Sequence, residues 1–240
     1  MKHLILIFII ASLIICCNHS ATKDNSSTND SIVPFRGLWV NENYIKSIKT
    51  TKSPIIGQSE VYESYIYIPS KLHQRTVMIY NFHDGGANLT IHRLDSSFWF
   101  YSLDLKDKYD KVMFYNNKLI KNNIPFVRIA DSTDKGILET ILFKGLYQLN
   151  DRQIEFTDEG MIKGWDKYDS YFPIDDYFGP ALNVDQIILK NGKNKVEKGF
   201  KFVNDSLYIY DLKYELYDSI NQQYDSVAFK EILYRLKKIN

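Results

Sequence analysis

Residues 76–94, TVMIYNFHDGGANLTIHRL, form two alternating stretches around the turn Asp84-Gly85-Gly86-Ala87. Apolar and polar side chains alternate on both sides of this turn, which is typical of an antiparallel hairpin, because neighbouring side chains on a strand point to opposite faces. The glycines supply the positive φ that tight hairpin turns need. A turn centred on them predicts that His83 and His92 are exposed. The predicted buried face consists of Met78, Tyr80, Phe82, Leu89 and Ile91.

Similar segments recur along the chain from Pro34 onward. Short runs of β-branched and aromatic residues are separated by Asp, Asn, Gly, Ser and Lys. A second turn, Asp158-Glu159-Gly160, joins two of them into a hairpin. The further runs are residues 61–68, 98–105, 111–115, 124–130, 152–157, 161–165, 185–190, 195–203 and 206–214. Evenly spaced strands predict an all-β fold, an antiparallel sandwich or barrel.

Helical patterns are few. Residues 42–50, ENYIKSIKT, place Tyr44, Ile45 and Ile48 on one face and predict one short helix. Residues 137–149 and 227–239 fit a helix or a strand. One or two short helices are therefore expected beside the strands.

The composition excludes several classes of protein. The 240 residues are 45% hydrophobic and 25% charged, which is typical of a soluble globular chain and excludes a disordered or multi-pass membrane protein. The 18 Tyr, 14 Phe and 3 Trp favour strands around a large core. The formal charge is +1, and removing the first 16 residues takes away only Lys2, which leaves basic and acidic residues equal in number. A neutral chain lacks the basic surface that nucleic acid requires.

The N-terminus has the pattern of an export signal. Met1-Lys2-His3 precedes an apolar run, residues 4–15, that is too short to span a bilayer. The run ends at Ile14-Ile15-Cys16-Cys17, which resembles a bacterial lipoprotein signal, with Ile14 three residues before the modified cysteine and Cys16 just before it. The resemblance implies that residues 1–16 are removed and that Cys17 carries a lipid with acyl chains such as palmitate.

The residues after Cys17 are polar. Residues 17–33 are expected to form a flexible tether, and residues 34–240 the folded domain. By the lipoprotein resemblance, Asn18 in place of Asp directs the protein to the outer membrane, facing the periplasm or the cell surface. Because the chain has only two cysteines, the mature domain would hold no disulfide, thiol nucleophile or cysteine–metal site.

Gly37-Leu38-Trp39 opens the first strand after the tether. It resembles the Gly-x-Trp signature of lipocalins and lipocalin-like bacterial lipoproteins. In the second half, Gly145-Leu146-Tyr147, EFTDEG (155–160) and LYIY (207–210) follow in the order found in such domains. The resemblance implies an up-and-down β-barrel that binds a small apolar ligand.

The chain contains one short internal sequence repeat, which we call the echo. FRGLW (35–39) and FKGLY (143–147) match in residue class at every position. The echo indicates either two related halves, 35–142 and 143–240, or two strands that begin alike.

The lipocalin resemblance also predicts how the barrel closes. It implies that Trp39 lies across a barrel end, where Gly37 lets the backbone pass close to a neighbour. An arginine from the last strand packs over the indole, and the matching residue is Arg235, expected within about 6 Å of the ring. We therefore interpret residues 227–239 as the closing strand. The alternative is that Trp39 is ordinary core and Arg235 ordinary surface.

The polar residues suggest no specific chemistry. His83 and His92 share a face of the 76–94 hairpin but would lie roughly 13 Å apart, too far for one ion, and His73 stands alone. A glycosidase would need two facing carboxylates. The acidic residues that cluster are Glu155, Asp158, Glu159, Asp166, Asp169, Asp175 and Asp176. We expect no catalytic residue, metal or cofactor.

The densest aromatic run is Phe98-Trp99-Phe100-Tyr101. It fits a strand covered on both faces, or an aromatic platform for a lipid or sugar at a barrel mouth. The function expected from the sequence is non-enzymatic: a membrane-anchored lipoprotein that binds a small hydrophobic or amphipathic molecule. The alternatives are a structural or interaction module of the cell envelope with a packed core, and a glycan hydrolase.

Overall fold

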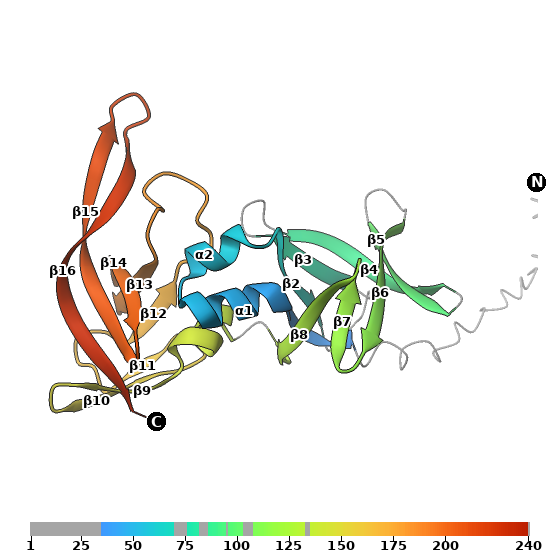
Figure 1. The fold of residues 1–240 in the computed structure, drawn as a ribbon, viewed down its shortest axis with the longest axis horizontal. Helices are drawn as coiled ribbons and strands as arrows, with labels where there is room; N and C mark the ends of the chain where they lie inside the picture. The colour runs from blue at the N-terminus through green and yellow to red at the C-terminus, as the bar shows by residue number, and fades with distance from the viewer. Residues whose placement is uncertain are drawn as a thin grey trace, which may run out of the picture. The chain divides into compact units, whose positions relative to one another are not determined.

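The computed structural model of the chain describes residues 35–69, 76–81, 86–94, 96–102, 108–132 and 135–239. The expected signal, Cys17 and the expected tether lie outside the described residues, as do His73 and His83. The described chain is mostly antiparallel β-structure with three short helices (Figure 1). This confirms the all-β class and the antiparallel barrel predicted from the sequence.

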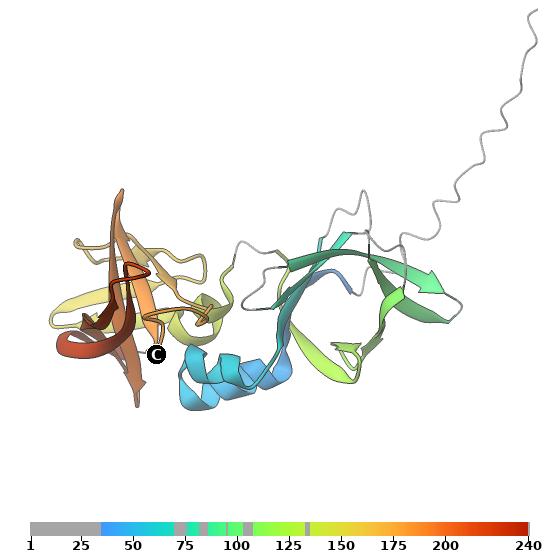
Figure 2. The same ribbon diagram turned by 90° about the horizontal axis from the view of Figure 1, so that it is seen from above.

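The first sheet is a closed barrel of eight described strands, each paired antiparallel with the next. Its strands are β1 (Gly37–Asn41), β2 (Glu63–Ile68), β3 (Thr76–Asn81), β4 (Gly86–Leu94), β5 (Ser97–Ser102), β6 (Lys108–Tyr115), β7 (Lys118–Lys121) and β8 (Ile124–Ala130). β8 pairs with β1, and this pairing closes the barrel and removes both sheet edges. Figure 2 shows these strands, coloured blue to green, curving around the barrel.

The buried residues of the first barrel are mostly apolar, apart from Ser64 and from Lys121, which pairs with Glu63 and Asp110. In β2, Ser64, Ile66 and Ile68 are buried, while the residues between them are half-buried. The other strands contribute Trp39, Leu89, Ile91, Phe100, Val112, Leu119 and Phe126, all buried. At the end that carries the β4–β5 and β6–β7 connections, the ring of Phe35 lies 4.7 Å from that of Phe98. Aromatic rings therefore fill this end of the barrel.

The β3–β4 hairpin forms as predicted, but with a different register. Gly86 pairs with Tyr80 inside the ladder, and Leu89 lies opposite Val77. A turn centred on the two glycines is therefore wrong. The physical reason is that Gly86 extends the ladder instead of supplying a turn position.

Part of the predicted burial pattern of this hairpin is confirmed. Leu89 and Ile91 are buried. The side chains of Met78, Tyr80 and Phe82 lie outside the described residues. His92 is half-buried rather than exposed, because its Nε2 shares a hydrogen bond of 2.8 Å with Thr90 Oγ1 and its ring packs 4.9 Å from that of Tyr101.

Two helices, α1 (Glu42–Thr51) and α2 (Pro54–Ser59), connect β1 to β2. Asn41 caps α1 by accepting a hydrogen bond from the backbone N–H of Asn43, and Ser53 caps α2 just before Pro54. The buried face of α1 is the predicted one, Tyr44, Ile45 and Ile48. It packs against the core of the second sheet.

The second sheet, coloured yellow to red in Figure 1, contains eight described strands in the order β11-β10-β9-β16-β15-β14-β13-β12. Its strands are β9 (Gly145–Leu149), β10 (Arg152–Phe156), β11 (Ile162–Lys163), β12 (Ser170–Pro173), β13 (Gln186–Asn191), β14 (Asn194–Val203), β15 (Ser206–Asp218) and β16 (Gln223–Ile239). An isolated bridge links Met161 beside β11 to Ser170 of β12. The predicted hairpin at Asp158-Glu159-Gly160 joins β10 to β11.

The two ambiguous segments have different structures. Residues 227–239 lie within β16, so the interpretation as a strand is confirmed. Residues 137–149 contain a short π-helix, η3 (Glu139–Phe143), followed by β9. The change from the first sheet to the second therefore falls close to the position that the internal echo suggested.

The same kind of hydrogen bond occurs at the first strand of each sheet. Trp39 Nε1 donates to the carbonyl oxygen of Phe35 over 2.5 Å, and Tyr147 Oη donates to the carbonyl oxygen of Phe143 over 2.8 Å. In both cases the donor lies four residues after the acceptor, and both donors are buried. The sequence echo thus corresponds to one local structure that occurs twice.

The first and last strands in chain order pair in the same way in both sheets. Arg128 of β8 and Lys238 of β16 are the register partners of these two aromatic residues. Each basic side chain lies across the preceding glycine: a Cβ on Gly37 would approach Arg128 Nε to 2.5 Å, and one on Gly145 would approach Lys238 Cε to 2.7 Å. Both glycines have positive φ angles, 125° and 152°. Each sheet therefore pairs its first strand with its own last strand.

The predicted contact between Trp39 and Arg235 is wrong. Trp39 is buried as expected, but β16 pairs with β9 and not with β1. The guanidinium of Arg235 lies over the ring of Tyr208, 5.2 Å from its centroid. Because the chain builds two sheets, the strand that pairs with β1 at the end of the first sheet is β8, and Arg128 is the register partner of Trp39.

The repeated hydrogen bond gives a stability prediction. Tyr147→Phe removes the donor that satisfies the Phe143 carbonyl, and a buried polar group left without its partner costs about 1–3 kcal/mol. We expect the free energy of unfolding in urea to fall by about 1–2 kcal/mol. Tyr217→Phe, at an exposed position of β15, is the control and should change it by less than about 0.5 kcal/mol. Equal losses in the two variants would contradict a role for this hydrogen bond.

Candidate functional site

A groove of about 450 Å³ opens beside η3, where β9, β10 and β11 meet. This volume falls within the usual range for small-molecule sites, about 300–1,000 Å³. The groove is lined by Lys144, Gly145, Leu146, Glu155, Phe156, Thr157, Asp158, Glu159 and Lys163. It includes the echo segment FKGLY and the EFTDEG turn, which lie apart in the sequence.

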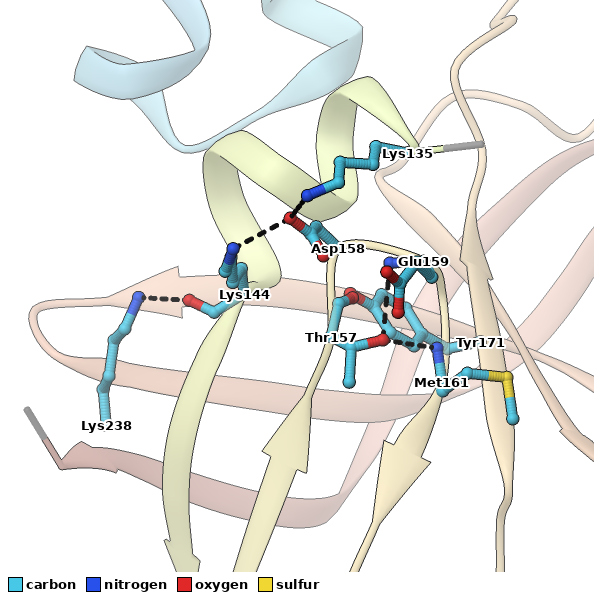
Figure 3. Close-up of polar contacts among 8 residues, drawn as sticks. All are labelled: Lys135, Lys144, Thr157, Asp158, Glu159, Met161, Tyr171 and Lys238. Atoms are coloured by element: carbon cyan, nitrogen blue, oxygen red, sulfur yellow. Dashed lines mark hydrogen bonds and ion pairs between the residues drawn. The ribbon is translucent and has the colours of Figure 1, made fainter. Parts of the chain in front are cut away.

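Asp158 is the centre of the polar contacts in the groove (Figure 3). Its Oδ2 accepts hydrogen bonds from Lys135 Nζ at 3.0 Å and from Lys144 Nζ at 2.8 Å. The bonds from Lys144 and Lys135 hold the pKa of the Asp158 carboxyl below its usual value. Lys135 precedes η3 and Lys144 follows it. Asp158 therefore holds the chain at both ends of this helix.

The turn that carries Asp158 is held by its own hydrogen bonds. Thr157 Oγ1 accepts from the backbone N–H of Met161 at 3.1 Å and of Glu159 at 3.3 Å. The Thr157 carbonyl accepts from Tyr171 Oη at 2.6 Å (Figure 3). The backbone of the turn also binds the segment before η3, since the Asp158 carbonyl accepts from the N–H of Gly136. Asp158 is therefore presented from a fixed backbone.

The rest of the groove offers charges of both signs. Lys163 pairs with Glu155 across β10 and β11 at 3.2 Å, and both side chains remain open to solvent. Beside the groove and outside its lining, Lys238 crosses Gly145 and donates to the Lys144 carbonyl at 3.0 Å (Figure 3). Burial, together with the charge of Lys52, lowers the pKa of the Lys238 ammonium. Together with Leu146, this lining suits a molecule that has both charged and apolar parts.

The structure brings together only some of the acidic residues that the sequence singled out. Glu155, Asp158 and Glu159 all line the groove. Because the pKa of Asp158 is lowered, this carboxyl is ionised at neutral pH and does not suit the role of a general acid.

The remaining acidic residues lie elsewhere. Asp166 pairs with Arg152 on the surface, and Asp169 Oδ2 accepts from the backbone N–H of Gly192 at 2.7 Å. Asp176 Oδ1 accepts from the N–H of Phe178. These three carboxylates therefore act in local turns and surface ion pairs.

Asp175 shares a second, smaller pocket of about 130 Å³ with Glu139. Glu139 is buried at the start of η3, and this burial raises the pKa of its carboxyl to about 7. The volume of the pocket is below the usual range for small-molecule sites. Sequence reasoning missed Glu139, although a single acid inside the apolar run ILETILF (137–143) is a visible signal.

The rings of the run Phe98–Tyr101 lie on two faces of β5. Phe100 is fully buried inside the first barrel, and Phe98 packs on Phe35 at its end. Trp99 and Tyr101 are half-buried on the opposite face of β5. The reason is the alternation of the strand, which sends neighbouring rings to opposite faces.

The groove residues Lys144, Leu146 and Lys163 were also missed, as was Lys135, which pairs with Asp158 from outside the groove lining. Lys144 lies in the echo at the position of Arg36, which marks it as part of a repeated structure. Within the described residues, no three His, Cys, Asp or Glu side chains gather as metal ligands. None of the helices in the described ranges is long and apolar enough to cross a membrane.

Comparison with known proteins gives no relative: the chain matches no protein-family model, no curated protein and no solved structure. Its function must therefore be argued from the chemistry of the groove and from the sequence.

Proposed function

We propose that the protein is a membrane-anchored extracytoplasmic lipoprotein that binds a small amphipathic molecule in the groove beside η3. The observation that carries the binding proposal is this groove of about 450 Å³, in which fixed charges of both signs lie beside Leu146. The second sheet supports it, because its strands hold the groove side chains in place.

The polar contacts suggest how such a ligand is held. Asp158 is already satisfied by two lysines, so it serves to position Lys144 rather than to bind the ligand directly. Lys163 and Glu155 form a solvent-exposed pair, which is worth little by itself and is readily exchanged for contacts to a ligand. An anionic group at the lysines with an apolar portion on Leu146 fits this arrangement.

The location in the envelope is supported by the N-terminal sequence alone. The apolar run with Ile14, Cys16 and Cys17 has the spacing of a lipoprotein signal, and a polar stretch long enough to act as a tether follows it. With Asn18 after Cys17, the outer membrane is the proposed destination, which makes the bilayer the first partner of this protein.

A structural or interaction module is the second candidate. It is favoured by the filled core of the second sheet, where the ring of Phe143 lies 4.9 Å from Phe200, 5.3 Å from Phe202 and 5.5 Å from Tyr171. A core packed with rings has no room for a ligand, as is usual in small barrels. In this candidate the groove is a surface feature that binds nothing.

Two cysteine variants test the anchoring. Cys17→Ser should move the protein from the membrane fraction to the soluble extracytoplasmic fraction and abolish the diacylglyceryl mass on the N-terminal peptide. Cys16→Ala is the matched control: it should leave lipidation and membrane location intact, because a small residue suits the position before the modified cysteine. Loss of lipid in Cys16→Ala with retention in Cys17→Ser would overturn the assignment of Cys17.

Native mass spectrometry of protein purified from its own membranes tests the binding. Wild type should carry a small molecule near equal stoichiometry, and Leu146→Arg, which blocks the groove, should reduce its occupancy at least tenfold. Leu216→Arg makes the same substitution at an exposed position of β15 and should keep full occupancy. Equal occupancy in all three proteins, or none in any, would favour the structural module.

A further inference from the structure

Three aromatic rings of the second sheet are arranged as the corner of a box. Trp165 follows β11, Tyr168 precedes β12 and Tyr234 lies in β16. The ring planes are nearly perpendicular in every pair, at 90°, 88° and 86°. The centroids lie 5.0 Å apart for Trp165–Tyr168, 4.9 Å for Trp165–Tyr234 and 6.3 Å for Tyr168–Tyr234.

A cation already lies over two rings of this aromatic corner, those of Tyr168 and Tyr234, while Trp165 and Tyr168 also belong to the core of the second sheet. The ammonium of Lys167 lies 5.6 Å from the centroid of Tyr168 and 5.3 Å from that of Tyr234, and it donates a hydrogen bond of 2.5 Å to Tyr234 Oη. Asp166 and Asp169 neighbour this lysine in sequence but are engaged by Arg152 and by backbone N–H groups. The ammonium therefore lies over ring faces instead of pairing with the nearest carboxylates.

Hydrogen bonds fix the backbone around the rings, whereas the Lys167 side chain reaches them from an exposed position. The backbone N–H of Tyr168 donates to the Trp165 carbonyl at 3.1 Å, and Asn191 Nδ2 donates to the carbonyl of Lys167 at 3.0 Å. Tyr234 is fixed by pairing with Ile209 in the neighbouring strand. If the hydrogen bond to Tyr234 Oη breaks, the exposed four-carbon side chain of Lys167 can move away and uncover the faces of Tyr168 and Tyr234.

We propose that the aromatic corner is a binding site for the alkylammonium group of an external ligand, with Lys167 as a built-in competitor. Ring faces attract cations through their quadrupole, and quaternary ammonium groups are a common ligand of such sites. The same chemistry occurs in free choline-like molecules and in lipid headgroups. This site is separate from the groove beside η3, and ligand binding at one does not depend on ligand binding at the other.

Removing the competitor gives the first test. In the mature lipidated chain, kept in a maltoside detergent that has no ammonium group, Lys167→Ala should bind choline more tightly than wild type, followed through the Trp165 indole resonance in NMR. If Lys167 occupies the corner about 90% of the time, the apparent affinity should rise about tenfold. Lys193→Ala removes an exposed lysine from the β13–β14 turn and should leave the affinity unchanged.

Further probes separate cation recognition from simple apolar packing. 3,3-Dimethylbutanol, the neutral isostere of choline, should bind Lys167→Ala at least fivefold more weakly than choline does. Tyr234→Phe keeps the ring but removes the hydroxyl that holds Lys167, so it should also tighten choline binding without a risk to folding. Soluble dihexanoyl phosphatidylcholine, compared with its phosphatidylglycerol analogue, identifies the source: preference for the former alone supports a lipid headgroup, and binding of free choline supports a small-molecule ligand.

Two results would overturn the proposal. One is choline binding by Lys167→Ala that is absent or no tighter than in wild type. The other is equal binding of choline and its neutral isostere. Either result would mean that the aromatic corner only packs the end of the second sheet.

Discussion

Glu139→Gln should make the protein more stable at pH 8 by about 2–3 kcal/mol, while leaving it nearly unchanged close to pH 4.5. Glu139 is buried at the start of η3, and burial raises the pKa of its carboxyl from 4.5 to about 7 in the folded chain. The charged form is disfavoured because it has lost water and faces Asp175 in the same pocket. Glutamine keeps the shape and removes this charge.

The sign follows from proton binding. Between pH 4.5 and about 7 the folded chain holds a proton on Glu139 that the unfolded chain releases, so the free energy of unfolding falls as pH rises through this range. Each pKa unit corresponds to about 1.4 kcal/mol, which gives roughly 3 kcal/mol for the whole interval. Burial also raises the pKa of Asp175, so that residue adds a contribution of the same sign.

Urea titrations at pH 4.5, 6 and 8 measure this effect. The difference in the free energy of unfolding between Glu139→Gln and wild type should increase steadily with pH. Asp218→Asn is the control: the pKa of this exposed carboxyl is lowered by hydrogen bonds from Asn221 and Ile220, so its removal should not stabilise the protein at any pH. If the free energy of unfolding changed with pH in parallel for wild type and Glu139→Gln, this carboxyl would not be buried in the folded protein.

Gly37→Ala should lower the free energy of unfolding by roughly 3 kcal/mol. The φ of Gly37 is 125°, a region that other residues rarely adopt, and this strain costs about 1–3 kcal/mol. The new Cβ would also lie 2.8 Å from the Ala130 carbonyl and 2.5 Å from Arg128 Nε. Since Ala130 belongs to β8, the methyl group would push apart the two strands that close the first barrel.

Two other glycines provide graded controls. A Cβ on Gly145 meets only the flexible end of Lys238, so Gly145→Ala should cost less than Gly37→Ala. At Gly192 the φ is 58° and a Cβ would meet no atom within 4 Å, so Gly192→Ala should cost about 1 kcal/mol. Combining Gly37→Ala with Arg128→Ala should recover only part of the loss, because the carbonyl contact remains. Equal costs at all three glycines in urea titrations would contradict the close approach of β1 and β8.

Strand positions could be predicted from the sequence because alternation and turn residues are local signals. The helical face of Tyr44, Ile45 and Ile48 and the strand at residues 227–239 were found in this way. The pairing register of the strands was not predicted correctly, since it depends on where the hydrogen-bonded ladder of each hairpin ends. In the β3–β4 hairpin, Gly86 joins the ladder, and one misplaced glycine changed every predicted pair.

The division into two sheets was only partly visible. The echo of FRGLW and FKGLY marks the first strand of each sheet, but nothing local says which later strand will close it. Arg128 and Arg235 both follow apolar residues near the end of a strand, and only the tertiary pairing distinguishes them. Loop closure between distant segments is a property of the whole chain, which explains the error at Arg235.

The candidate site was the least predictable part. Asp158 and its turn were singled out, yet Lys135 and Lys144 gain meaning only because η3 places them on either side of this carboxylate. Glu139 looks like one more acid in the sequence, and its raised pKa comes from burial beneath residues that are distant in the chain. Sites of this kind depend on long-range packing, which residue patterns do not record.

An experimental structure of the lipidated chain, purified from its own membrane without exchange of bound molecules, tests the proposed ligand site most directly. The account predicts density for a small molecule in the groove beside η3, with its charged group at Lys144 or Lys163 and its apolar part against Leu146. A groove that holds only solvent, in protein shown by mass spectrometry to be fully lipidated at Cys17, would contradict the account and leave the structural module as the remaining explanation.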